Sequence, residues 1–350
     1  MLGSSLVAAA RAEVQGAQPG PLRFPIDFGA HPDVRTEWWY ATGTLEAEAR
    51  LWGFQITFFR AATGIATDHP SRFAAGQLVF AHAALTDFEQ KRLRHDERIA
   101  RSGFGVAAAA VGDTHVVLRD WTFDREGDIG KSRYVARLPA GRAGFGFDLR
   151  LLTTQPLLLQ GIDGLSRKGP RPEASSRYYS QPQLAVDGAL SIEGKTVAVS
   201  GRAWLDHEWS DSFLDPDAVG WDWVGMNLAD GSALTAFRLR RRDGSALYAG
   251  GSFRKPGATT RDFAPAEVRF DAGRRWSSAA SKASYPVEWT IDTPAGRYMV
   301  KALLDDQELD SRASTGAIYW EGLSDLHDAR GERVGRGYLE MTGYAAPLAL

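Results

Sequence analysis

The chain has 350 residues, a net charge of −2 and no cysteine. This balance excludes the strong basic field that attracts nucleic acid or an anionic membrane, and the lack of cysteine excludes disulfides and thiolate metal sites. The 11 Trp, 10 Tyr and 17 Phe exceed what core filling usually needs and favour a broad apolar ligand surface. We therefore expect a hydrophobic small molecule as the partner, and no nucleic acid.

Residues 1–21 are expected to be disordered or a signal-peptide remnant. The run "SLVAAARA" resembles the end of a signal-peptide apolar region, with Ala10-Arg11-Ala12 as a small-residue cleavage site, although a positively charged start is missing. Ordinary N-terminal disorder explains the segment about as well. The export interpretation predicts a periplasmic or secreted protein.

After this segment, short stretches rich in aromatic and β-branched residues alternate with turn dipeptides. Helices with apolar residues at i, i+3 and i+4 are almost absent, and the best candidate is residues 88–102, "FEQKRLRHDERIARS", as a surface helix or an exposed connection. Many short strands with hairpin turns predict an all-β sandwich or barrel.

One polar stretch interrupts this pattern at residues 210–220, which contain Pro216 and Gly220. It predicts a boundary between an N-terminal domain, 22–210, and a C-terminal domain, 211–350. Each domain carries a tryptophan-rich strand that leads into a hairpin, "EWWYATGTL" in the first and "WDWVGMNL" in the second. This echo is compatible with duplicated barrels.

The densest group of ionisable residues lies in "WLDHEW", which begins at Trp204 and ends at Trp209. Because strand side chains alternate, Asp206 and Glu208 share one face with Trp204, and His207 shares the other with Trp209. Two close carboxylates in a dry site push one pKa upward, and a carboxyl that stays protonated near neutral pH is a general acid. Alternatively, both acids point to solvent at a strand end.

A second carboxylate, Asp222, lies between Trp221 and Trp223. It is interpreted either as a further acid or a water-holding base, or as a turn carboxylate that accepts from nearby backbone amides. The sequence favours the two interpretations of Asp222 about equally.

A third cluster is "EWWY", in which Glu37 precedes Trp38, Trp39 and Tyr40. Glu37 is expected to be a buried acid or to orient another group, and to lie with the aromatic residues in a ligand wall that binds the substrate. The alternative is that they close one end of a barrel.

No metal or cofactor is expected. The seven histidines show no H-x-H or H-x-x-x-H spacing, no G-x-S-x-G elbow occurs, and the glycine-rich stretches lack a following helix. A lone apolar-flanked histidine such as His82 is usually a satisfied core residue.

Several separated motifs resemble one family: "RFPIDFGAHPDVRTEWWYATGTL", "GFQITFFR", "AHAALTD", "SGRAWLDHEWS" and "WDWVGMNLADGSALTAFRLR". Together they resemble the carotenoid 1,2-hydratase (hydroxyneurosporene synthase) and AttH-like family over residues 22–345. The resemblance implies two lipocalin-like (calycin-type) antiparallel β-barrel domains packed together. It carries a functional His and Trp onto His207 and Trp209, and a carboxylate beside an aromatic residue onto Asp222 with Trp221.

The resemblance implies a cofactor-independent acid–base enzyme that adds water to a C=C bond of a hydrophobic isoprenoid or polyene-like substrate. Asp206 or Glu208 would donate the proton, with Asp222 next in order, and His207 would orient the acid or hold the attacking water. The remaining indoles would bind the apolar chain. The alternative is a periplasmic lipid carrier of the AttH type linked to an ABC transporter, in which "DHEW" is an interdomain latch.

Overall fold

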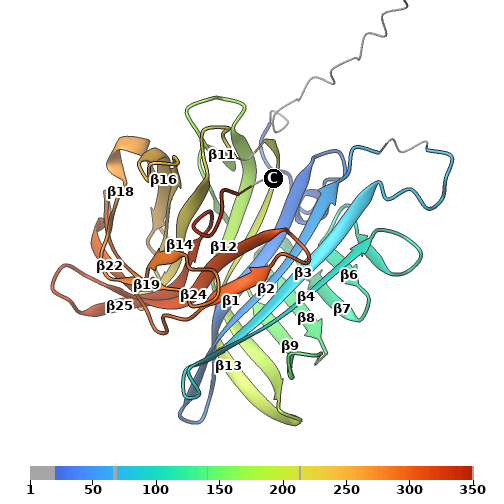
Figure 1. Ribbon diagram of the computed structural model, residues 1–350, viewed down its shortest axis with the longest axis horizontal. Helices are drawn as coiled ribbons and strands as arrows, with labels where there is room; N and C mark the ends of the chain where they lie inside the picture. The colour runs from blue at the N-terminus through green and yellow to red at the C-terminus, as the bar shows by residue number, and fades with distance from the viewer. Residues whose placement is uncertain (1–19, 66–68, 140, 213, 349–350) are drawn as a thin grey trace, which may run out of the picture.

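The computed structural model describes residues 20–65, 69–139, 141–212 and 214–348. In these ranges nearly all of the regular secondary structure is antiparallel β-strand (Figure 1), which confirms the all-β prediction. None of the helices in the described ranges has the length and apolar character needed to cross a bilayer. The expected disordered or signal segment lies outside the described residues except for its last two. The helices are the 3-10 turns η1 (Ile26–Phe28), η2 (Ile129–Lys131) and η3 (Pro265–Glu267).

The first sheet has 13 strands and curls into a nearly closed barrel around its own apolar core. Its main path runs β4-β3-β2-β1-β13-β12-β9-β8-β7-β6-β5, and the β4 edge comes back against β6. The strands are β1 (Thr36–Ala47), β2 (Arg50–Ala62), β3 (Gln77–Asp87), β4 (Arg92–Arg101), β5 (Ala107–Ala109), β6 (His115–Leu118), β7 (Trp121–Glu126), β8 (Arg133–Leu138), β9 (Phe145–Leu152), β10 (Leu158–Leu159), β11 (Leu165–Arg167), β12 (Ser175–Ile192) and β13 (Lys195–Ser212).

The second sheet has 10 strands in the main order β17-β16-β15-β14-β25-β24-β22-β21-β18 and surrounds a separate apolar core. Its strands, with the small β19–β20 pair, are β14 (Gly220–Leu228), β15 (Ala233–Arg240), β16 (Ala246–Arg254), β17 (Arg261–Phe263), β18 (Arg269–Ala272), β19 (Arg275–Ser277), β20 (Ser284–Pro286), β21 (Glu288–Thr293), β22 (Gly296–Ala302), β23 (Glu308–Ser311), β24 (Ala317–His327) and β25 (Arg333–Met341).

A third apolar cluster joins the two sheets. It includes Tyr40 and Trp204 of the first sheet and Trp223, Leu323 and Tyr338 of the second. The outer faces of β1, β2 and β13 therefore pack against β14, β24 and β25, and we call this contact the seam (Figure 1). The change of sheet falls between Ser212 and Gly220, just after the expected domain boundary at 210/211.

The expectation of a helix over 88–102 was wrong. A turn over residues 88–91 reverses the chain, and β4 pairs antiparallel with β3 at the edge of the first sheet. The dense charge that suggested a surface helix is typical of an edge strand, because charged side chains keep an edge from pairing with other chains.

Strands β1 and β13 hold the sequence clusters side by side. Their antiparallel register pairs Trp38 with Glu208 and Tyr40 with Asp206. Over residues 203–210 β13 is buried on both faces, and the paired part of β1 is almost entirely buried, since one face lines the barrel core and the other faces the seam. Neighbouring residues in each strand therefore lie in two different environments.

Candidate functional site

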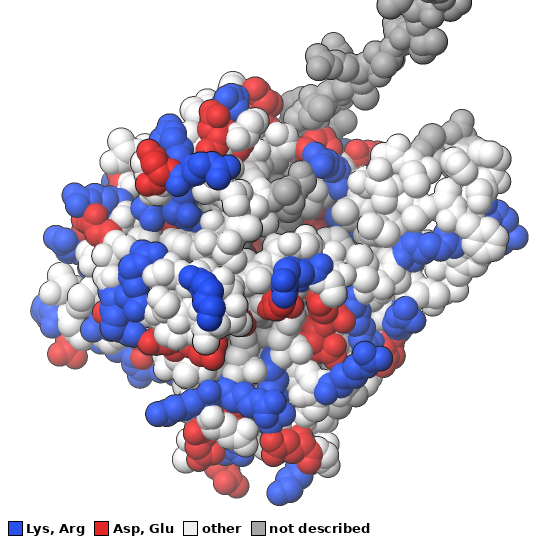
Figure 2. All heavy atoms as spheres, viewed as in Figure 1, with Lys and Arg blue, Asp and Glu red and all other residues white. Residues whose placement is uncertain are grey.

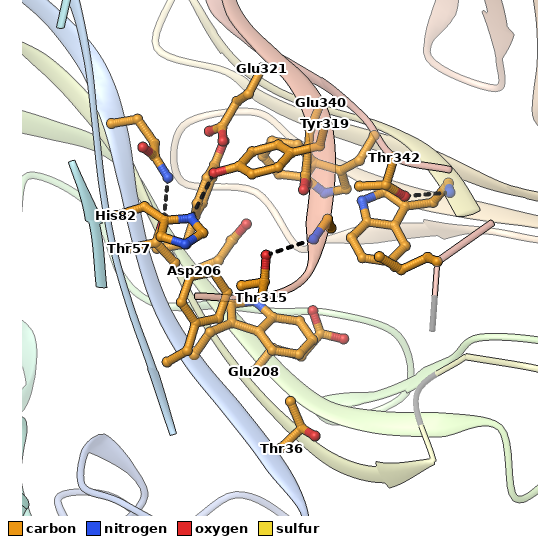
Figure 3. Close-up of a pocket in the computed structure, with 18 of the residues that line it drawn as sticks. Thr36, Thr57, His82, Asp206, Glu208, Thr315, Tyr319, Glu321, Glu340 and Thr342 are labelled. Carbon is orange, nitrogen blue, oxygen red and sulfur yellow. Dashed lines mark hydrogen bonds between the residues drawn. The ribbon is translucent and has the colours of Figure 1, made fainter. Parts of the chain in front are cut away.

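A cavity of about 300 Å³ opens at one end of the seam (Figure 3). Both sheets contribute to it, so neither barrel contains the whole site. Its wall is mainly apolar, nine of the 24 lining residues are Trp, Tyr or Phe, and polar side chains from both sheets are set among them. The first sheet and the segment before β12 supply Thr36, Trp38, Tyr40, Gln55, Thr57, Phe59, Phe80, His82, Lys168, Tyr178, Asp206 and Glu208; the second sheet and the segments beside it supply Trp221, Trp223, Phe237, Leu239, Ser314, Thr315, Ala317, Tyr319, Glu321, Glu340, Thr342 and Leu348.

Asp206 is a buried carboxyl in this cavity whose close hydrogen-bond donors are uncharged. Its Oδ1 accepts from Ser180 Oγ at 2.5 Å and from Trp204 Nε1 at 2.7 Å. Burial raises the pKa of Asp206 to about 7 and the nearby Glu208 charge adds to the rise, although the hydrogen bonds from Ser180 and Trp204 oppose it. The side chain is therefore able to hold a proton near neutral pH.

Glu208, two residues along β13, has a cationic partner. Lys168 Nζ lies 2.8 Å from Glu208 Oε1, and Ser176 donates to the same carboxylate. The Lys168 ammonium also lies 4.7 Å from the ring centres of Tyr178 and Phe237. Lys168 pairs with Glu208, whereas the close donors to Asp206 are uncharged, so Asp206 is the better proton donor of the two predicted acids.

Two more carboxyl groups enter from the second sheet. Glu321 of β24 and Glu340 of β25 are cross-strand partners, and Figure 3 shows them across the cavity from Glu208. Burial, and then the charge of Glu340, raise the pKa of Glu321 well above its usual value. Burial raises the pKa of Glu340 to about 7, and Glu208 contributes to the rise.

A hydrogen-bonded chain crosses the seam at the edge of the cavity. His82 Nδ1 lies 2.9 Å from the Tyr319 hydroxyl, and His82 Nε2 lies 2.8 Å from Ser314 Oγ, which donates to Glu97. Burial, with His95 nearby, lowers the pKa of His82 to about 3, so the imidazole is neutral. His82 is satisfied, as its apolar flanks suggested, but it lines the cavity and does not belong to a barrel core.

His207 lies on the opposite face of β13, inside the first barrel. Its Nε2 donates to Glu37 Oε1 at 2.9 Å, its Nδ1 lies 3.1 Å from the Tyr179 hydroxyl, and Trp39 stacks on its ring. Burial lowers the pKa of His207 to about 4 even though Glu37 opposes the change. The expectation that His207 orients the catalytic acid or holds the attacking water was wrong, because alternation turns it away from Asp206 and out of the cavity.

Glu37 also lies inside the first barrel and not in the cavity, which corrects its placement in the ligand wall. Burial alone would raise its pKa, but hydrogen bonds from His207 and His31 outweigh burial and hold the pKa below the usual value. Arg60 Nε donates to Glu37 Oε2 at 2.7 Å. Glu37 therefore orients the two histidines, which is one of the roles expected for it.

His31, Glu37 and His207 bring their ligand atoms within 4.8 Å of one another. Two histidines and a carboxylate form a known metal-binding set. Here, however, Glu37 already accepts from both imidazoles and from Arg60, so the residues fit a closed hydrogen-bonded cluster better than a cation site. The absence of a metal remains a prediction.

Asp222 does not reach the cavity and points into the second barrel. It is fully buried, its Oδ2 lies 2.7 Å from Arg238 Nε and 3.1 Å from Arg240 Nε, and Tyr344 donates to its Oδ1 at 2.8 Å. The expectation that Asp222 is an acid near Asp206 was wrong, and so was the turn-carboxylate alternative. Asp222 is an ion-paired structural residue.

The tryptophans expected to bind substrate divide between the two faces of their strands. Trp38, Trp221 and Trp223 line the cavity together with Tyr40. Trp39 and Trp209 instead belong to the core of the first barrel, and Trp204 packs in the seam. Only alternate residues of each sequence cluster therefore line the cavity.

Sequence reasoning missed several cavity residues. Glu321 is buried and Glu340 is half-buried, and each interrupts an apolar strand segment, "IYWEGL" and "GYLEM". An acid in such a segment was the available signal. Lys168 and Ser314 lie in irregular segments without a motif.

On the face of the molecule drawn in Figure 2, acidic and basic side chains are interspersed.

The fold and site define an all-β protein of two packed, lipocalin-like sheets with a carboxyl-bearing aromatic cavity between them. The family model described as AttH-like matches residues 15–344, and the chain belongs to this family. No curated protein sequence matches it.

Solved structures agree with this family and fold. A protein described as an AttH from Nitrosomonas europaea is 47% identical, with a TM-score of 0.86 over 94% of this chain and 98% of that chain. Kievitone hydratase from Nectria haematococca is 14% identical, with a TM-score of 0.70 over 93% and 94%. CghA, solved with Sch210972, is 12% identical, with a TM-score of 0.52 over 90% and 88%. The two distant similarities establish the shared fold.

Proposed function

We propose that the chain is a cofactor-independent acid–base enzyme that adds water to a C=C bond of a hydrophobic isoprenoid or polyene-like substrate in the seam cavity. The observation that carries the proposal is Asp206, a carboxyl that is buried among aromatic rings and has no cationic partner among the described residues. That kievitone hydratase shares the fold supports the proposal.

The chemistry follows from the residues of the cavity. Protonation of a substituted alkene by Asp206 leaves a positive carbon, and an aromatic face stabilises a cation by about 0.5–2 kcal/mol. Trp38, Trp221 and Trp223 offer such faces. A positioned acid typically contributes about 10²–10⁴-fold to the rate. The resemblance to carotenoid 1,2-hydratases extends the proposal to a terminal double bond of an acyclic carotene.

The test incubates the protein in H₂¹⁸O with two probes, geranylgeraniol and 4-(3-methylbut-2-enyl)phenol, and detects hydrated product by mass spectrometry. The expected result is a product with one ¹⁸O hydroxyl, formed without added cofactor. The Asp206→Asn variant should lose this activity and the exposed-turn control Asp243→Asn should keep it. Equal activity of Asp206→Asn and wild type would contradict the proposal.

The aromatic lining also suits a second function, a periplasmic lipid carrier of the AttH type that works beside an ABC transporter. Export would follow from the signal-like start of the chain. Native mass spectrometry of protein purified without detergent separates the two functions. An unmodified lipid retained in a one-to-one complex, with no turnover of either probe, would favour the carrier.

A further inference from the structure

The proposed function leaves the two acids of the second sheet without a role. We propose that Glu321 and Glu340 form a second proton-transfer pair, which accepts the proton of the attacking water while Asp206 donates one to the alkene carbon. This inference rests on the proposed function of the cavity. It makes the seam essential, because the acid and the base then belong to different sheets.

The first argument is the position of the pair. Glu321 and Glu340 are directly opposite in the β24–β25 ladder, and both line the cavity. The Cβ atoms of such partners are about 4.5–5.5 Å apart, a separation at which two like charges destabilise a sheet. The pair avoids this cost when the two carboxyl groups hold one proton between them. One member is then a carboxylate that can act as a base.

The second argument is an unused acceptor. Glu321 is 3% exposed, and its Oε1 has no hydrogen-bond partner among the described residues. The nearby Tyr40 hydroxyl lowers the pKa of Glu321 but does not satisfy Oε1. A buried acceptor left unpaired costs about 1–3 kcal/mol, so a water O–H in the cavity would be held there. This atom marks where the attacking water is positioned.

The third argument is the electrostatic link between the walls. The charge of Glu208 raises the pKa of Glu340 and that of Lys168 lowers it, although burial is the largest cause of the shift. Glu208 and Glu340 also line the same cavity, so the two walls lie within reach of one substrate. Glu340, with a pKa of about 7, is the member that loses its proton more readily and is the base, while Glu321 stays neutral.

The reaction balances with these groups alone. The Asp206 O–H bond breaks, and the alkene π electrons form the new C–H bond, which leaves a carbocation. A lone pair of the water oxygen then forms the C–O bond. One water O–H bond breaks and its proton passes to Glu340. One water is added in total, and exchange with solvent returns the proton to Asp206.

The experiment measures hydration of the same two probes against pH, with Glu340→Gln, Glu321→Gln and Glu332→Gln as variants. Glu332 is an exposed residue of the β24–β25 hairpin and serves as the matched control. Glu340→Gln should slow turnover by about 10²–10⁴-fold and remove the acidic limb of the pH–rate profile, because no base remains to be protonated. Glu321→Gln should slow turnover less and shift that limb, and Glu332→Gln should match wild type.

The failures are distinguishable. If Asp206→Asn loses turnover while Glu340→Gln and Glu321→Gln keep the wild-type rate and both limbs, the second pair is wrong and the proposed function stands. If wild type hydrates neither probe, the proposed function fails. A ¹³C NMR titration of wild-type protein labelled at the Glu carboxyl carbons then decides about the pair: one signal that titrates near neutral pH beside a second that stays protonated there supports it, and signals that are ionised throughout overturn it.

Discussion

Asp206 and Asp222 are both buried aspartates in tryptophan-rich strands. The charge of the groups around them differs. Asp206 is 4% exposed and its close donors are the uncharged Ser180 and Trp204. Asp222 is 0% exposed and is paired with the guanidinium groups of Arg238 and Arg240. Burial is nearly equal in the two cases, so the charge of the neighbours makes the difference.

The comparison teaches how a fold separates a reactive carboxyl from a structural one. A buried carboxyl without a cationic partner keeps its proton. A cationic partner keeps the carboxyl ionised, and replacing that carboxyl then costs stability because the cation is left unpaired. The first kind can serve proton transfer, and the second holds two strands of a sheet together. The four predictions that follow test this contrast.

The largest expected effect is on turnover. Asp206→Asn should lower kcat for the hydration of either probe by about 10²–10⁴-fold, because the amide has no proton of suitable acidity to give. Asp222→Asn, assayed at equal concentrations of folded protein, should keep kcat within a factor of about two. Steady-state rates of the two variants check this, and equal losses in both would remove the distinction.

The second effect is on stability, and here Asp222→Asn is expected to have a larger effect than Asp206→Asn. Asp222→Asn should lower the free energy of unfolding by about 3–5 kcal/mol, because the buried Arg240 and the partly buried Arg238 lose their counter-ion. Asp206→Asn should change it far less, since no cation is left behind. Urea denaturation followed by tryptophan fluorescence measures both. A greater loss in Asp206→Asn would show that Asp206 is the structural member of the pair.

The third effect is a pH dependence of stability. The pKa of Asp206 is raised from 3.8 to about 7, so between these values the folded state binds more protons than the unfolded state. Asp206 therefore lowers the free energy of unfolding as pH rises through this window, by up to about 1.4 kcal/mol per pH unit. Asp206→Asn should show a flatter profile than wild type from about pH 4 to about pH 7. Identical profiles would be inconsistent with a raised pKa.

The smallest effects come from the hydroxyl donors. Tyr344→Phe removes one hydrogen bond to Asp222 and should cost about 1 kcal/mol of stability without changing the pH–rate profile. Ser180→Ala removes a donor that lowers the pKa of Asp206, so the alkaline limb of the profile should move to higher pH. Denaturation and pH–rate measurements on the two variants check this, and an alkaline limb moved by Tyr344→Phe would contradict it.

The sequence was sufficient for most of the strands and for Asp206 and Glu208 on one wall of the site. Alternation along "WLDHEW" correctly placed Asp206 and Glu208 on a face apart from His207. It also contained an unused signal about Asp222: a hairpin turn at Asp230-Gly231 puts Arg238 opposite Asp222 in the β14–β15 register. Counting that register predicts the ion pair and would have removed Asp222 from the catalytic candidates.

The opposite wall could not be predicted in the same way. Glu321 and Glu340 lie far along the chain from Asp206, and they face it only because the two sheets pack through their outer sides. Local patterns carry no information on which outer faces meet. The same limit applies to β4 (Arg92–Arg101). A strand is an edge strand when it has a paired strand on one side alone, and the local charge pattern does not show which strand that is.

By itself, the sequence determined the all-β character of this protein, the alternation that divides each cluster between two faces, and the acids that a strand places together. These features depend on the two-residue period of a strand and on turns a few residues long. The tertiary structure decided which face became a cavity wall, which acid met an arginine and which carboxyl groups share the space between the sheets. Burial and neighbouring charge set the chemistry of a carboxyl, and both are created by residues distant in the chain.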